Sequence, residues 1–108
     1  MRPQPCAANY AVLWLEQETS GELLAGKLEL CSSSLVLEGG VREARRSLEI
    51  PYRELASVTV NGALAERLRG LPALRLERRT GHGVNLASLA GTGVLFELSS
   101  YLTALIAT

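Results

Sequence analysis

Apolar and polar residues alternate through most of the chain with the two-residue period of a β-strand. Short clusters of Ser, Gly, Asn and Pro separate the alternating segments and are typical of turns. The pattern predicts seven strands, over residues 10–17, 21–31, 35–38, 47–52, 57–60, 74–77 and 84–88. The segment from Ala63 to Arg69 is expected to form one or two helical turns.

The step Ile50-Pro51-Tyr52 separates two of these strands by very few residues. Pro51 cannot donate a hydrogen bond to a strand ladder, so it belongs at an edge or where a strand ends. Consecutive strands that meet at such a corner are what a small, strongly bent antiparallel barrel requires.

The C-terminal segment changes to a helical period. Thr92, after Gly91, is a plausible N-cap. The apolar residues expected on the buried stripe of this helix are Val94, Leu95, Leu98, Tyr101, Leu102 and Leu105. Val94, Phe96 and Leu98 also fit an alternating strand, but the helix is preferred because its stripe continues to Leu105.

Seven strands followed by one amphipathic helix resemble the pleckstrin-homology-like (PH-like) superfamily, especially small bacterial PH-like and GRAM-like domains. The matching segments are GKLELCSSSLVLEG, SLEIPYRELASVTV, GLPALRLERRTGHGVNLASL and the terminal helix. The resemblance covers residues 10–108 and leaves 1–9 as a tail. It implies a mainly β fold, a seven-stranded bent antiparallel barrel capped by the helix. Phe96 or Tyr101 is expected to replace the helical tryptophan of eukaryotic relatives.

The composition suits one non-catalytic domain. The chain has 108 residues, 47% of them hydrophobic, and a formal net charge of zero, which does not favour a nucleic-acid partner. It contains no Asp, and its single His82 lies between two glycines of a predicted turn. We expect no catalytic residue, cofactor or metal site. The lack of an export signal or a run of ~20 apolar residues favours a cytoplasmic location.

Cys6 and Cys31 do not have a metal-ligand spacing. If the first two strands pair around Glu18-Thr19, the two cysteines face each other and a cross-strand disulfide is geometrically open. Pro3 and Pro5 argue against pairing this far along the strand, and a reducing compartment argues against the bond. Free thiols are therefore expected.

The first strand is apolar on both faces, whereas a sheet with one wet face should alternate. Either cover from the tail or a loop, or an interface with a protein partner or a second copy, explains this pattern. We favour an interaction module, with Trp14 as the anchor of the interface. The predicted interface residues are Val12, Leu13, Trp14, Leu15, Leu23 and Ala25.

The alternative function is reading an anionic lipid or phosphate ligand. PH domains that bind phosphoinositides usually carry cations between their first two strands, but here that loop, residues 17–20, is acidic and has none. Arginine suits phosphate, and the predicted loop between strands three and four is rich in it. The candidate anion-binding residues are Lys27, Arg42, Arg45 and Arg46. A membrane surface as partner belongs to this alternative.

Overall fold

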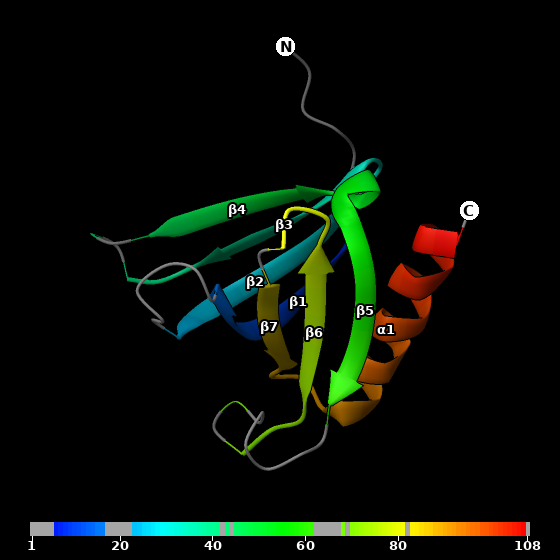
Figure 1. Cartoon of the computed structure of the whole chain (residues 1–108). Coiled ribbons are helices and arrows are strands. Elements are labelled where there is room, and N and C mark those ends of the chain that lie inside the picture. The colour runs from blue at the N-terminus through cyan, green and yellow to red at the C-terminus, as the bar shows by residue number, and fades with distance from the viewer. Residues whose placement is uncertain are drawn as a thin grey trace.

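A computed structural model of the chain describes residues 6–16, 23–41, 43, 45–61, 68, 70–81 and 83–107. Its elements are β1 (Cys6–Glu16), β2 (Leu24–Cys31), β3 (Ser34–Gly39), β4 (Arg46–Pro51), the 3-10 turn η2 (Tyr52–Glu54), β5 (Leu55–Asn61), β6 (Ala73–Arg78), β7 (Gly83–Ser88) and α1 (Thr92–Ala107) (Figure 1). The predicted helical turns at 63–69 lie largely outside the described residues.

The strands form one antiparallel sheet in the order β4-β3-β2-β1-β7-β6-β5. The sheet curls, and α1 lies beside β5 at one end of the curl (Figure 1). Strand β1 joins the two halves, because it pairs with β2 through residues 6–14 and with β7 through residues 12–16. The predicted bent antiparallel barrel with a C-terminal helix is confirmed.

Strand β1 starts earlier than the alternation predicts. It begins at Cys6, so residues 6–9 belong to the sheet and not to the predicted tail. Its pairing with β2 reaches Cys6, with a register shift between Cys6 and Ala8, past the point where the nearby prolines were expected to end it.

The corner at Pro51 is as predicted. Strand β4 ends at Pro51, three residues form η2, and β5 begins at Leu55. Strand β4 is at one edge of the sheet, which is where a proline is tolerated.

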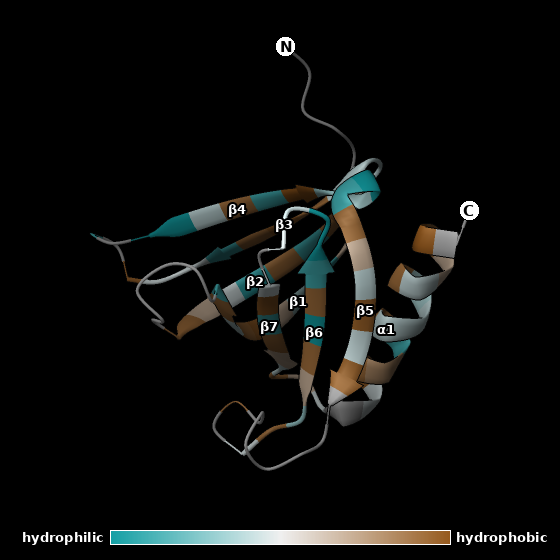
Figure 2. Cartoon of the chain, viewed as in Figure 1, coloured by the Kyte–Doolittle hydropathy of each residue, from teal (hydrophilic) through white to brown (hydrophobic). Residues whose placement is uncertain are grey.

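The core lies inside the curl. Brown and teal residues alternate along β4 and β6, as expected for strands with one buried face (Figure 2). The helix contributes Leu95, Leu98 and Leu102, which are fully buried. At ~1.5–3 kcal/mol for each such side chain, α1 is integral to the fold.

Two expectations about the helix are wrong. Tyr101 is 49% exposed, so the buried stripe of α1 runs through Leu98 and Leu102 without it. Phe96 is 55% exposed, so neither aromatic fills the core in place of a helical tryptophan. The tryptophan of the core comes from β1 instead.

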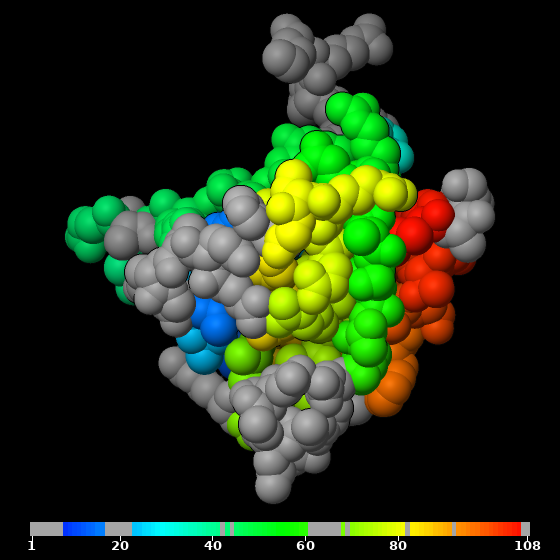
Figure 3. Space-filling model, viewed as in Figure 1, coloured from blue at the N-terminus to red at the C-terminus, as the bar shows by residue number. Residues whose placement is uncertain are grey.

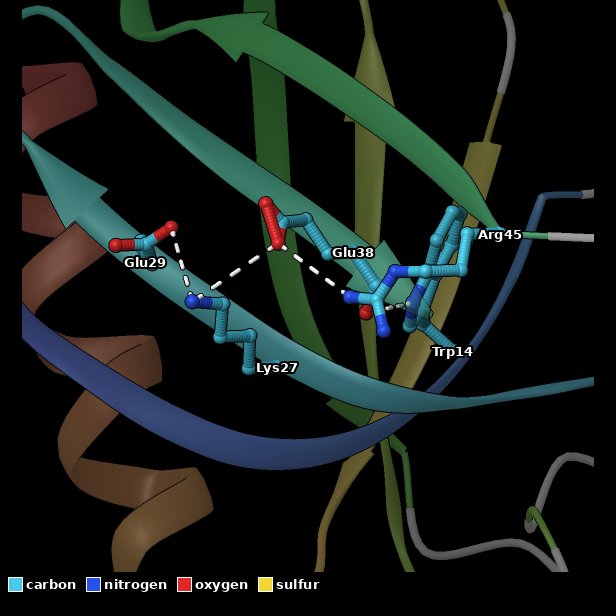
Figure 4. A network of polar contacts seen from close by, with 5 residues as sticks. All are labelled: Trp14, Lys27, Glu29, Glu38 and Arg45. Atoms are coloured by element: carbon cyan, nitrogen blue, oxygen red, sulfur yellow. Dashed lines mark hydrogen bonds and ion pairs between the residues drawn. The ribbon is translucent and has the colours of Figure 1, made fainter. Parts of the chain in front are cut away.

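Trp14 lies against Gly39 of β3 in the core of the domain. Its indole Nε1 donates a hydrogen bond to the carbonyl oxygen of Glu38 at 3.0 Å (Figure 4). Gly39 follows Glu38 and pairs with Gly26 of β2. A Cβ on Gly39 would stand 2.8 Å from the indole Nε1, and a Cβ on Gly26 would overlap the Glu38 carbonyl oxygen. Both positions therefore require glycine.

Gly39→Ala should destabilise the domain by about 1–3 kcal/mol, because the added methyl group displaces the indole from its buried position. Urea unfolding followed by circular dichroism measures this loss. Gly93→Ala is the matched control, since a Cβ there meets no atom within 4 Å and alanine favours a helix. Equal stability of Gly39→Ala and the parent chain would contradict the proposed packing.

Candidate functional site

The predicted interface on β1 is largely buried within the domain. Val12 and Trp14 belong to the main core, and Leu13 is only 4% exposed. Val12 and Trp14 point into the main core and Leu13 and Leu15 lie on the opposite face, as expected of one of the two pairs, but Leu13 is covered within the domain. Leu15 and Leu23 are half-buried and Ala25 is exposed, so only these three keep accessible surface.

A second, smaller apolar cluster explains why β1 is apolar on both faces. Leu13 pairs in register with Ala87 of β7, and residues paired in register share a face of the sheet. Ala87 packs in a cluster with Leu68 and Ala73, with Leu71 against it. Residues between β5 and β6 thus cover the outer face of β1. This agrees with the first of the two explanations for its apolar faces, cover by a loop.

The described residues of the predicted anion-binding site form ion pairs with glutamates. Lys27 lies 3.6 Å from Glu29 and 3.9 Å from Glu38, and Arg45 lies 3.7 Å from the same Glu38 carboxylate (Figure 4). The pairing of β2 with β3 places Lys27 directly opposite Glu38. These contacts lower the positive potential expected in this region.

Arg46 is matched in the same way at the end of β1. It lies 3.5 Å from Glu16, which also accepts a 3.0 Å hydrogen bond from Arg78. Arg42, the fourth predicted residue, lies outside the described residues.

Cys31 is disulfide-bonded, and the register of β1 and β2 places Cys6 opposite it. The expectation of free thiols is therefore wrong. The register shift after Cys6 supplies the alignment that the two prolines were expected to prevent. Disulfides persist in oxidising compartments, so this bond weighs against the predicted cytoplasmic location.

Tyr52, at the corner after β4, is anchored to the end of β2. Its hydroxyl donates to the Cys31 carbonyl oxygen at 2.7 Å, and its backbone N–H donates to the Ser33 carbonyl oxygen at 3.1 Å. Burial, reinforced by the neighbouring Tyr101, raises the pKa of Tyr52 from 10.0 to about 12. The phenol is therefore neutral at physiological pH.

A pocket of about 320 Å³ opens beside this corner. It lies where η2, the residues after β6 and the last turn of α1 meet, seen in green, yellow and red at the upper right of Figure 3. Its lining residues are Tyr52, Arg53, Leu55, Arg79, Leu105 and Ile106. We call this the corner pocket.

Backbone carbonyl groups of Arg53 and Glu54 hold Arg79 in place at the corner pocket. The Arg79 Nε donates to the Arg53 carbonyl oxygen at 2.8 Å, and the Arg79 N–H donates to the Glu54 carbonyl oxygen at 2.8 Å. The turn after β6 is thereby tied to the start of β5. The terminal nitrogens of the Arg79 guanidinium take no part in these bonds.

The charges at the corner pocket are not compensated as the others are. Among the basic side chains in the described part of the chain, five form ion pairs with glutamates. Only Arg53 and Arg79 have no described carboxylate within 4.0 Å. Sequence reasoning missed them, because Arg53 and Arg79 stand 26 positions apart and meet only through the fold.

Among the described residues there is neither a candidate metal-binding cluster nor a candidate membrane-spanning helix. Residues 6–16, 23–41 and the later described segments contain no group of three or more metal-ligating side chains. No helix in the described chain has the length and apolar character needed to cross a bilayer.

Seven bent antiparallel strands closed by a C-terminal helix define a PH-like fold, and solved structures share it. The Vps36 N-terminal PH domain superposes with a TM-score of 0.68 at 18% identity, over 98% of this chain and 82% of that one. The C-terminal domain of an unknown protein from Leishmania infantum gives the same TM-score at 16% identity, over 92% and 84%. No family model and no curated protein matches the sequence.

The single tryptophan provides a direct test of the buried β1. Trp14 is 1% exposed, so its fluorescence should be blue-shifted relative to free tryptophan and resist quenching by iodide in the folded protein. Trp14→Ala should cost about 3–5 kcal/mol of stability. Ready quenching by iodide under native conditions would show that the side chain is on the surface.

Alkaline unfolding tests the environment of Tyr52. Below pH 10 the phenol is neutral in both states, so its contribution to stability is fully present. Between pH 10 and about 12 the unfolded state ionises first, and stability falls as the pH rises. Tyr52→Phe should lower the free energy of unfolding by about 1 kcal/mol at neutral pH. Over the alkaline range its free energy of unfolding should fall less steeply with pH than that of the parent chain. Urea unfolding at a series of pH values measures both; identical pH profiles would contradict the assignment.

Proposed function

We propose that this PH-like domain is a non-catalytic binding module that takes up an acidic group at the corner pocket. The observation that carries the proposal is the coincidence of a pocket with the two arginines that no described carboxylate neutralises. Guanidinium groups present several donors in a fixed plane, which suits carboxylate and phosphate. The proposal keeps the anion-reading function and moves it away from the loop between β3 and β4.

The orientation of Arg79 favours this role. Its Nε is already bonded to a backbone carbonyl, so the plane of the guanidinium is fixed before a ligand arrives. Less side-chain freedom is then lost on binding, which favours affinity. Glu54, the carboxylate nearest to Arg53 in sequence, does not line the pocket.

The structure supports a protein partner or a homodimer less well. The β1–β2 surface expected to carry such an interface retains only Leu15, Leu23 and Ala25, and Trp14 is buried. The remaining exposed large apolar residues are Val41, Leu89, Phe96 and Tyr101 among those described, and single exposed apolar residues are ordinary on a protein surface.

Charge reversal at the pocket tests the proposal. Inorganic phosphate, titrated into the labelled protein, should shift the backbone amide resonances of Arg53, Leu55, Arg79 and Ile106 in NMR spectra. The double variant Arg53→Glu/Arg79→Glu should abolish these shifts. Added neutral salt should weaken the parent's binding, because the contact is electrostatic and solvent-accessible.

The matched control is Lys27→Glu/Arg45→Glu, which changes the net charge by the same amount at the originally predicted site. It should leave phosphate binding at the corner pocket unchanged. Shifts that centre on Lys27 and Arg45, and that only this control removes, would return the anion site to the first prediction and overturn the proposal.

A further inference from the structure

The corner pocket is apolar on the side that faces the helix. Leu55 is fully buried at its base, and Leu105 and Ile106, both half-buried, form the wall contributed by α1. The two arginines belong to other elements, η2 and the turn after β6. The pocket thus has a cationic side and an apolar side.

We infer that the ligand of this site is a single-chain amphiphile, an acidic headgroup joined directly to one alkyl chain. This inference rests on the proposed function, since it assigns a chemical class to the acidic ligand. A small inorganic anion would satisfy the arginines and leave the apolar wall in water. A neutral apolar molecule would cover the wall and leave the guanidinium groups without a partner.

The helix sets the orientation of the ligand. Leu105 and Ile106 are in the last turn of α1, and the aligned peptide dipoles of a helix give its C-terminal end a partial negative charge. An anion is repelled there and attracted to Arg53 and Arg79. The headgroup therefore lies toward the arginines and the chain runs along Leu105 and Ile106.

The size of the pocket sets the number of chains. A volume of about 320 Å³ is at the small end of the range for ligand pockets. It suits one short alkyl chain rather than the two chains of a membrane phospholipid. The inferred ligand is accordingly a free amphiphile taken from solution.

A chain-length series tests the inference on the full chain. Acetate, hexanoate, octanoate and decanoate are titrated below the concentrations at which they form micelles, and binding is followed by NMR and calorimetry. Affinity should rise roughly four-fold for each methylene that enters the pocket, and then level off when the pocket is full. Arg53→Glu/Arg79→Glu should remove binding of every member.

Ile106→Ala should reduce the gain with chain length while leaving acetate binding unchanged. Phe96→Ala is the matched control, because Phe96 is an exposed apolar residue of the same helix outside the pocket. It should leave the whole series unchanged. If Ile106→Ala does not fold, the chain-length series on the parent protein still tests the inference.

Each other result overturns the inference in a recognisable way. Equal affinity for acetate and decanoate at the pocket would contradict the inferred amphiphile but would leave the proposed anion site in place. Chain-length dependence that persists in Arg53→Glu/Arg79→Glu would place the alkyl chain elsewhere. Binding to two-chain anionic vesicles without binding of decanoate would make the ligand a membrane surface. Absence of both phosphate and alkyl carboxylate binding would remove the proposed function as well.

Discussion

The burial of Trp14 against Gly39, which itself packs on Gly26 of β2, is the interaction on which the rest of the domain depends. Trp14 lies in the part of β1 that pairs with β2 on one side and β7 on the other, so it is positioned where the two halves of the sheet meet. Gly39 leaves room for the indole, and Gly26 lets the backbones of β2 and β3 approach closely. The hydrogen bond of the indole to the Glu38 carbonyl satisfies the one polar atom that this packing buries.

Most of this architecture could be predicted from the sequence, because alternation and a helical stripe record which face of each element is buried. Pro51 marked the corner, and Leu95, Leu98 and Leu102 marked the helix face. The errors arose where burial came from elsewhere in the chain. Leu13 is buried on the outer face, where Leu68 and Leu71 pack over Ala73 and Ala87, and alternation within β1 holds no information about that cover.

The candidate site was much less predictable. Lys27 and Arg45 were selected because basic residues gather in that region, but strand register brings Glu38 between them. A count of charges along the sequence cannot show which cations are neutralised across strands. Arg53 and Arg79 carry no local signal, since each is followed or preceded by other charged residues and their proximity depends on the corner after β4.

Although the formal net charge is zero, charge is therefore unevenly distributed over the surface. Glutamates accompany the described cations on the outer face of β2 and β3 and at the end of β1, whereas no carboxylate in the described part of the chain pairs with the arginines of the corner pocket. The same corner holds its backbone firmly: Tyr52 is anchored to the end of β2, and Arg79 to Arg53 and Glu54. Arginines without a described carboxylate partner, next to an apolar wall, favour the binding of a small ligand, because neither the Arg79 guanidinium nor the surrounding backbone must be reorganised to receive it.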